Sequence, residues 1–437
     1  MSDSKTSFME GFAEKLGGIA ARINSWRYII VIKNAFAALV PVIMLGAFGT
    51  LLGTMVFGDT QGLAQYEALS FLALFKPIAD AMSWVSLSFI TIYVVFLMGI
   101  ELAHINNVKG FFAGVVAVMS YLAVNPSTYQ FTSDEAGTID VSSVLASQYT
   151  DAKGLFLGMI VAIAAIELWC WLGRQEKLQI KMPDTVPPNV AASFSKLIPT
   201  IFTVTVMAIV GFAIKALTGM YAYDIVYSLV QQPLQGVTQG LPGFLVLMTV
   251  AQVFWLIGIH GVQIVMPIRD PLFLAAITAN SAAFAAGTDA PYIINQSFWD
   301  VFACFGGSGC TIGLIVAIFI ASKRADHREI AKLSLPCGIF NINEPLIFGL
   351  PIILNPIMAI PFIVTPLVTG SFAYFATALG FCGKCVVAVP WATPPVLSAW
   401  LATAGNINAV IVQVICIILS IVIFLPFVKV ANRAKEA

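Results

Sequence analysis

Long apolar segments recur along this chain and constrain its fold more strongly than any other feature. A helix needs about 20 apolar residues, at about 1.5 Å of rise each, to cross a hydrocarbon layer of about 30 Å. The sequence therefore predicts an all-α integral membrane protein that crosses a bilayer many times. The clear candidate spans are Ala35–Phe57, Trp84–Ile100, Gly110–Val124, Gly154–Gly173, Ile198–Leu217, Phe244–Pro267, Val301–Ser322, Pro356–Gly380 and Ile407–Val428, and the weaker ones are Leu63–Met82 and Pro271–Gly287.

The composition agrees with a surface that mostly faces lipid. Charged residues make up 10% of the 437 residues and hydrophobic residues 59%, whereas a soluble domain carries about 25% charged residues. The 22 Lys and Arg residues balance the 22 Asp and Glu residues. Nucleic-acid binding relies on excess positive charge that neutralises phosphates, so we expect a lipid bilayer as partner and no nucleic acid.

The distribution of charge among the loops predicts the orientation. Cytoplasmic loops are enriched in Lys and Arg, and cations cluster in residues 1–33, in Arg174–Lys196 and in residues 429–435. Residues 1–33 are polar and lack the pattern of a cleavable signal. The loop Asn125–Lys153 is acidic and is predicted to lie outside. Both termini are then cytoplasmic, so the crossings must be even in number: either one weaker segment crosses, or one clear segment is re-entrant.

A run of prolines interrupts the second half of the chain. A proline inside a helix removes a backbone hydrogen bond, and broken helix at membrane depth must be buried in protein or line a wet cavity. Because many transporters build solute sites from such interrupted helices, the run favours a carrier for a polar solute. A kinked but ordinary span is the alternative. The prolines are Pro345, Pro351, Pro356, Pro361 and Pro366.

Glu344 is the first candidate for a functional residue. It lies between apolar segments, where a carboxylate costs a few kcal/mol on insertion scales and is usually retained for function. The following Pro345 disfavours the α conformation at Glu344, so we expect the carboxylate to project from non-helical backbone. Asn341 and Asn343 flank it and add amide donors and acceptors. The alternative is an interfacial cap near a loop.

His260 is the second candidate, because it alone among the three histidines is surrounded by apolar sequence. A buried histidine on its own is as often a structural hydrogen-bonding group as a functional one. Together with Glu344, it predicts a site that binds a hydroxyl group and moves its proton.

Several other residues carry weaker signals. Trp255 and Trp391 are either interface anchors or platforms for the apolar face of a sugar ring, and the surroundings of Trp391 favour a platform. The segment Gly306-Gly-Ser308-Gly309 fits a turn, a close helix contact or a cradle of backbone donors. Glu167 has either a structural partner or a functional role.

Cofactors and metals are not expected. The seven cysteines lie mostly in apolar runs, where a free thiol behaves as a small hydrophobic group. Cys382-Gly-Lys-Cys385 has redox-like spacing, but no second pair or nearby histidine completes a metal-ligand set. The chain also lacks a Walker motif and an H-E-x-x-H motif.

Four runs of sequence resemble the enzyme II C component of the phosphoenolpyruvate-dependent sugar phosphotransferase system. The resemblance is to the lactose, cellobiose and N,N'-diacetylchitobiose family, and it extends over nearly the whole chain. The first and last runs are specific to this family, whereas the glycine-rich one is weak by itself. The runs are Met182–Pro199, Gly258-Ile-His-Gly261, Gly306-Gly-Ser-Gly-Cys-Thr311 and Ile339–Gly349.

The resemblance implies a fold of about ten transmembrane helices with two re-entrant hairpins in a bacterial cytoplasmic membrane. It also implies three parts: an amphipathic cytoplasmic segment at residues 1–34, a dimerising transmembrane half at 35–218 and a sugar-binding half with the hairpins at 219–437. The protein would be a homodimer. Because the sequence ends shortly after Val428, we expect a separate soluble B component to act in trans.

The resemblance further implies that Glu344 and His260 contact the sugar near its 6-hydroxyl, which receives a phosphoryl group from the phosphocysteine of the B component. We therefore assign these two residues to the reaction. The chain would be a transporter that forms the membrane part of a phosphotransferase rather than an enzyme that works alone. The residues we assign to sugar binding are Asn343, Asn341, Trp255, Trp391, Gly261 and Ser308.

The sequence thus predicts a permease for a β-linked disaccharide of the cellobiose, diacetylchitobiose or lactose type. An ion-coupled secondary sugar transporter is the alternative, since Glu344 is equally able to bind a coupling ion. An intramembrane serine protease is a weaker alternative, because Ser308 lies in a Gly-x-Ser-Gly element but needs a histidine beside it.

Overall fold

The computed structural model describes residues 18, 22, 25–59, 62–133, 137–180, 183, 186–187, 194–350, 352 and 355–432. Most of the predicted N-terminal segment 1–34 lies outside the described residues, as do Asp134 and Glu135 of the acidic loop and most of the motif at 182–199. Arg433 and Lys435 of the tail also lie outside them. The chain divides into two compact units, which we call the N-terminal unit (residues 26–43 and 84–234) and the C-terminal unit (residues 44–83 and 235–437).

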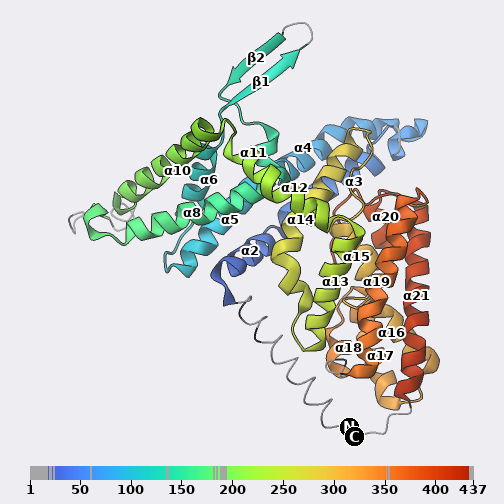
Figure 1. Cartoon of the computed structure of the whole chain (residues 1–437). Helices are drawn as coiled ribbons and strands as arrows, with labels where there is room; N and C mark the ends of the chain where they lie inside the picture. The colour runs from blue at the N-terminus through green and yellow to red at the C-terminus, as the bar shows by residue number, and fades with distance from the viewer. Residues whose placement is uncertain are drawn as a thin grey trace. The chain divides into compact units, whose positions relative to one another are not determined.

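The N-terminal unit is a group of apolar helices with one β-hairpin. The hairpin pairs β1 with β2 in antiparallel register, Thr128 opposite Ser142, and it projects from one end of these helices (Figure 1). The elements are α2 (Arg27–Ala38), α5 (Ile90–Ile105), α6 (Phe112–Val124), β1 (Thr128–Ser133), β2 (Gly137–Ser142), α7 (Ser147–Thr150), α8 (Leu155–Gly173), α10 (Leu197–Thr218) and α11 (Ala222–Val226), with 3₁₀ turns at Ala152–Gly154 and Glu176–Leu178 and a π turn at Tyr227–Gln231.

Small residues bring the helices of this unit into close contact. A Cβ atom added to Gly99 in α5 would lie 2.7 Å from the Cβ of Ala117 in α6, so the two backbones approach as small residues allow in membrane proteins. Glu167 of α8 forms an ion pair with Arg27 of α2. Of the two interpretations of Glu167, the structural partner is the one that the structure shows.

The C-terminal unit contains the longer helices and every candidate site residue. Residues 44–83 contribute to it most of α3 and α4. The elements are α3 (Val40–Leu51), a π turn at Leu52–Val56, 3₁₀ helices at Leu63–Gln65 and Glu67–Phe75, α4 (Lys76–Leu87), α12 (Gln232–Thr238), α13 (Leu241–Leu256), α14 (Gly261–Ala285), α15 (Gln296–Ala303), α16 (Ile312–Ala321), α17 (Ala325–Ile339), α18 (Glu344–Gly349), α19 (Pro356–Ala378), α20 (Leu397–Ala402) and α21 (Ile407–Ala431).

One apolar core joins α13, α16, α18, α19 and α21. Its buried side chains include Trp255, Leu314, Ile347, Phe362 and Phe424. Burial of a large apolar side chain stabilises a soluble fold by about 1.5–3 kcal/mol; in a bilayer the comparable contribution comes from close packing. These five helices therefore form a fixed frame around the chain breaks described below.

Two segments of the C-terminal unit fold back on themselves. In the first, α18 returns along α17, and a Cβ added to Gly349 would lie 2.7 Å from a side-chain carbon of Ile330. In the second, the N–H groups of Val386 and Val387 both donate to the carbonyl oxygen of Ala402. Figure 1 shows α17 and α18 at one end of α19 and α21, and α20 at the other. Both segments have the form of the re-entrant hairpins that the resemblance implies.

Four predicted spans do not correspond to single helices. Ala35–Phe57 is divided between α2 and α3, and Trp84–Ile100 between α4 and α5. Two further spans are divided at glycine turns. The segment Phe244–Pro267 is divided, because α13 ends at Leu256 and α14 begins at Gly261; the weaker candidate Pro271–Gly287 forms the rest of α14. The segment Val301–Ser322 is divided between α15 and α16. Positive φ values explain both breaks: 81° at Gly258 in the first, and 74° at Gly306 in the second. Glycine adopts such values without steric cost, whereas hydropathy does not detect them.

By length and composition, six of the described helices could cross a membrane, or up to eight if each bent pair counts as one span. Both weaker candidates overlap helices of this kind: Leu63–Met82 overlaps Glu67–Leu87, and Pro271–Gly287 overlaps Gly261–Ala285. Shorter apolar helices occur as well, namely α5, α6 and α16. The helical membrane fold is confirmed, and the number of ten crossings stays a prediction.

The close contact of α5 with α6 predicts the effect of one added methyl group. We expect Gly99→Ala to lower the free energy of unfolding by roughly 1–3 kcal/mol, because over-packing forces the two helices apart. The thermal midpoint of detergent-purified protein measures this change. The control is Gly236→Ala in α12, where an added Cβ meets nothing within 4 Å and alanine favours the helix. A Gly99→Ala protein as stable as the unchanged chain would contradict the close contact.

Candidate functional site

The first break in helical structure places His260. After α13 ends, Gly258 takes a left-handed conformation and His260 becomes the residue that precedes α14. A Cβ on Gly261 would lie 1.7 Å from the carbonyl oxygen of Ala251, so glycine alone lets α14 begin against α13. The ring of Trp255 lies 4.4 Å from the imidazole ring, centroid to centroid. The imidazole is therefore fixed by a turn on one side and an indole on the other.

The second break is the glycine-rich turn between α15 and α16. Gly306, Gly307 and Gly309 all have positive φ, between 74° and 95°. The hydroxyl of Thr311 donates to the carbonyl oxygen of Gly306 and closes the turn. A Cβ on Gly307 would lie 2.4 Å from the amide carbon of Asn343. The turn can thus approach Asn343 only because it carries no side chain there.

The third break, between α17 and α18, is held by the side chain of Asn341. Asn341 has a φ of 64°, a conformation that asparagine tolerates better than most residues. Its amide oxygen accepts a hydrogen bond from the N–H of Gly306 at 2.6 Å. Its amide nitrogen donates to the carbonyl oxygens of Trp391 at 2.6 Å and Thr393 at 3.0 Å. One side chain therefore joins the glycine turn to the tips of both hairpins.

Asn343 makes a second set of bonds across the same junction. Its amide nitrogen donates to the carbonyl oxygen of Ser308 at 2.7 Å and to the hydroxyl of Thr311 at 3.0 Å. Its own carbonyl oxygen accepts from Leu346 and Ile347 at the start of α18. Asn343 is 3% exposed, so these bonds satisfy polar groups that would otherwise be buried without partners.

Glu344 is the first residue of α18 rather than part of a non-helical segment, which corrects the expectation drawn from Pro345. Proline at the start of a helix costs nothing, because the N–H it lacks would have no partner within the helix. The non-helical backbone lies just before it, where Phe340 follows α17 and Asn343 precedes α18. The short helix α18 therefore begins at the meeting point of the hairpin tips and carries the carboxylate there.

The carboxylate of Glu344 and the imidazole of His260 face each other. Oε1 of Glu344 lies 3.9 Å from Nε2 of His260, and the two side chains are 44% and 39% exposed. Hydrogen bonds between heavy atoms span about 2.7–3.2 Å. A hydroxyl oxygen can therefore lie within hydrogen-bonding distance of both atoms at once. The geometry suits the binding of one hydroxyl group between a carboxylate and an imidazole.

The structure brings the remaining predicted residues to the same junction but gives them different surroundings. Trp391 is 55% exposed, and its indole is accessible as a platform. Trp255 is 3% exposed and lies in the core against His260. Gly261 provides the close approach of two helices, and Ser308 offers its carbonyl oxygen to Asn343. Since both amide protons of Asn341 and of Asn343 bond to the scaffold, direct sugar contacts by these residues stay predictions.

Sequence reasoning did not identify a group of buried charged residues in α14 and α15. Arg269 of α14 donates to Asp270 at 2.7 Å, and its guanidinium lies 5.1 Å from the ring centroid of Trp299. Asp300 of α15 accepts from Gln296 at 3.0 Å. The signal was present, because charges inside apolar helices are uncommon. Among the described residues, no group of three or more His, Cys, Asp or Glu side chains is placed to hold a metal ion.

A helical membrane protein whose broken helices and hairpin tips meet at an accessible carboxylate and imidazole belongs to the class of solute carriers. Comparison with known proteins gives the family. A family model described as "Phosphotransferase system, EIIC" matches residues 33–366. The chain therefore belongs to the EIIC family of the phosphotransferase system, as the sequence motifs indicate.

Individual relatives cover nearly the whole chain. The lichenan permease IIC component of Bacillus subtilis is 32% identical over 97% of this chain and 93% of its own length. The cellobiose-specific EIIC component of Lactococcus lactis is 31% identical over 99% of this chain and 98% of its own. The crystal structure of the transporter ChbC, the IIC component from the N,N'-diacetylchitobiose-specific phosphotransferase system, matches with a TM-score of 0.91 and 30% identity. That match covers 97% of this chain and 98% of ChbC.

The bonds of Asn343 predict a loss of stability even without sugar. Asn343→Asp keeps the shape of the side chain but removes both donors and places a carboxylate against the carbonyl oxygen of Ser308. We expect roughly 1–3 kcal/mol of destabilisation, measured as the thermal midpoint of sugar-free protein. Asn107→Asp, at an exposed position just after α5, is the control and should lower the midpoint by less, because only the weak effect of a negative charge near a helix C-terminus applies there. An Asn343→Asp protein that melts normally but binds sugar poorly would instead assign Asn343 to sugar contact alone.

Proposed function

We propose that the chain imports a β-linked disaccharide and presents its 6-hydroxyl for phosphorylation by the phosphocysteine of a separate B component. The observation that carries this proposal is the accessible pair of Glu344 and His260, 3.9 Å apart. Relatives named for lichenan, oligo-β-mannoside and cellobiose support a β-linked saccharide as the substrate class. The exposed indole of Trp391 suits the apolar face of a sugar ring.

The proposed reaction divides between the two partners. The phosphorus–sulfur bond of the phosphocysteine breaks, its electron pair returns to sulfur, and the 6-oxygen of the sugar forms the new bond to phosphorus. The proton of that hydroxyl passes to Glu344 or His260, which act as the general base. Phosphoryl transfer depends mainly on alignment and charge stabilisation. The role of this chain is therefore to hold the hydroxyl at a fixed position and to accept its proton.

The orientation and the assembly are part of the proposal. Asn432, after α21, accepts from the N–H of Lys323 at 2.9 Å and donates to the carbonyl oxygen of Ala321 at 2.9 Å. The cationic segment 323–332 thus lies beside the end of α21, which itself carries Lys429. We place this end in the cytoplasm, following the preference of cations for that side. We assign dimerisation to the N-terminal unit and sugar binding to the C-terminal unit.

Energy coupling tests the proposal as a whole. Vesicles that contain this chain, the B component and the general phosphotransferase proteins should accumulate phosphorylated cellobiose when phosphoenolpyruvate is supplied, because the phosphoryl group drives the uptake. An ionophore that collapses ion gradients should leave the initial rate unchanged. Labelled sugar separated by its charge measures the product. Uptake of unmodified sugar that the ionophore abolishes would overturn the proposal in favour of an ion-coupled transporter.

Two substitutions test the proposed roles at the site. Glu344→Gln keeps the shape and removes the charge, so we expect sugar phosphorylation to fall by about 100-fold or more, within the usual range for loss of a general base. His260→Ala should weaken sugar binding more modestly, by about tenfold, the effect of about 1.4 kcal/mol. Binding and single-turnover phosphorylation in detergent measure both.

The amount of protein in the membrane and its thermal midpoint serve as controls for these variants. Undiminished phosphorylation in Glu344→Gln would show that the role assigned to Glu344 is wrong. Unchanged affinity in His260→Ala would return His260 to a structural role.

A further inference from the structure

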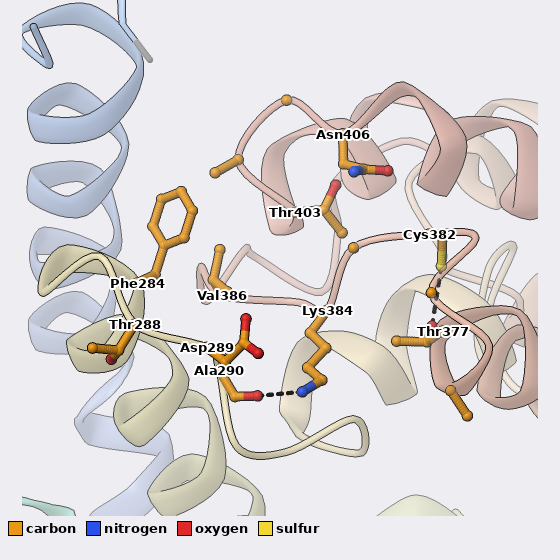
Figure 2. Close-up of a pocket in the computed structure, with 15 residues that line it drawn as sticks. Phe284, Thr288, Asp289, Ala290, Thr377, Cys382, Lys384, Val386, Thr403 and Asn406 are labelled. Atoms are coloured by element: carbon orange, nitrogen blue, oxygen red, sulfur yellow. Dashed lines mark hydrogen bonds between the residues drawn. The ribbon is translucent and has the colours of Figure 1, made fainter. Parts of the chain in front are cut away.

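A cavity lies in the C-terminal unit, and neither Glu344 nor His260 lines it. It has a volume of about 620 Å³, within the range of about 300–1,000 Å³ that is typical of small-molecule sites. It is open on one side and is lined by three parts of the chain: the end of α14 with the segment after it, the end of α19 with the loop after it, and the turn before α21 (Figure 2). The lining side chains used below are Phe284, Asp289, Thr377, Lys384, Thr403 and Asn406.

This cavity lies at the far end of α14 and of α19 from the proposed catalytic pair. α14 begins directly after His260 and ends beside Phe284 after 25 residues, or about 37 Å at 1.5 Å per residue. α19 runs in the same sense, since Met358 near its start packs in the core with Trp255, whereas Thr377 near its end lines the cavity. The cavity is therefore a distinct place in the molecule and not an extension of the first site.

The loop that carries Lys384 is held rigidly. It contains the Cys382-Gly-Lys-Cys385 motif, whose cysteines are buried and free. The thiol of Cys382 lies 3.0 Å from the hydroxyl of Thr377. The carbonyl oxygen of Cys385 accepts from Asn280 at 2.8 Å and from Asn295 at 3.1 Å. These hydrogen bonds fix both ends of the motif, and Lys384, which lies between the two cysteines, is thereby held at the edge of the cavity.

The lining groups combine the chemistry that recognises a neutral polyhydroxylated ligand. The ammonium of Lys384 donates to the carbonyl oxygen of Ala290, and an ammonium has three such donors. The carboxylate of Asp289 is exposed beside it, and Phe284 adds an aromatic ring (Figure 2). The positive and negative charges cancel. A neutral ligand with many hydroxyl groups therefore fits better than an anion.

Asn406 adds an oriented amide to this lining. Its side-chain oxygen accepts from the N–H of Ala409 at 3.0 Å and caps α21. The opposite end of the amide faces Gly383, where an added Cβ would lie 3.1 Å from Nδ2. Because Gly383 has no side chain, the amide nitrogen stays within reach of the cavity. The amide is thus fixed before any ligand arrives.

We propose that this cavity is a second saccharide site, which receives the sugar on the external face before it moves to Glu344 and His260. The ligand class and the side rest on the function proposed above. The position of the cavity agrees with the orientation proposed above, in which the cationic segment 323–332 is cytoplasmic. Asn406 precedes α21 at the cavity, and α21 ends beside that segment after 25 residues, or about 37 Å at about 1.5 Å per residue. That length exceeds the thickness of about 30 Å of a hydrocarbon core.

A double variant, Asp289→Asn with Lys384→Met, tests the proposed second site by comparing the uptake of external sugar with the phosphorylation of sugar in detergent. The full chain is studied in vesicles with its phosphotransferase partners. We expect the KM for uptake of external cellobiose to rise about tenfold with an unchanged maximal rate. In detergent, where sugar reaches Glu344 directly, the KM for phosphorylation should not change. Asp140→Asn with Lys153→Met, exposed charges on the other predicted external segment, is the matched control and should change neither value.

Direct binding gives an independent readout. Purified protein that carries both Glu344→Gln and His260→Ala, and so lacks both groups of the first site, should still show a weak saturation-transfer NMR signal with cellobiose, and the added Asp289→Asn and Lys384→Met changes should abolish it. Inorganic phosphate should neither bind nor compete. An unchanged uptake KM with an unchanged NMR signal would overturn the second site. Displacement of the sugar by phosphate would overturn it in favour of an anion site.

The two proposals fail in different ways. If phosphoenolpyruvate does not drive uptake, the proposed function fails, while the NMR arm still decides whether the cavity binds a saccharide. If the double variant does not fold, Asp289→Asn alone decides, because Asp289 is exposed and its replacement disturbs no packing. In that case a normal uptake KM and a normal NMR signal would overturn the second site.

Discussion

The structure depends on how this chain satisfies the backbone groups that its broken helices expose. A helix break inside a bilayer leaves N–H and C=O groups without partners, and each costs several kcal/mol in hydrocarbon. Here the side chains of Asn341 and Asn343 supply the partners, bonding to Gly306, Ser308, Trp391 and Thr393. Because these bonds cross between segments, they both permit the breaks and hold them together.

The proposed chemistry follows from that junction. His260 lies at the break between α13 and α14, and Glu344 begins α18 just after the break that Asn341 and Asn343 hold. Each residue is thus carried by rigid backbone at the end of a helix, which is how a site acquires fixed geometry. Both side chains are partly exposed, and Oε1 of Glu344 lies 3.9 Å from Nε2 of His260. The same device, an irregular segment anchored by buried amides, shapes the cavity around Lys384.

Sequence reasoning identified the ionisable residues better than it located the backbone around them. Glu344 and His260 stood out because charge and imidazole are costly in apolar segments. The prolines indicated broken helix, and the helix does break within their run, since Pro345 lies at the start of α18 and Pro356 begins α19. Pro361 and Pro366, however, lie inside the continuous α19, and a further break falls at Asn341, where no proline indicates it. The amides of Asn341 and Asn343 looked like ligands for a sugar because their partners, some 35 to 52 residues away in sequence, leave no local pattern. For the same reason, the grouping of residues 44–83 with 235–437 was not predictable.

The most direct measurement is an experimental structure of this chain with cellobiose bound in lipid. The account predicts a sugar hydroxyl within hydrogen-bonding distance of both Oε1 of Glu344 and Nε2 of His260, at the junction that Asn341 and Asn343 hold. A structure in which no saccharide hydroxyl lies near Glu344, and in which the Glu344 carboxylate is turned toward another protein group or toward lipid, would contradict it.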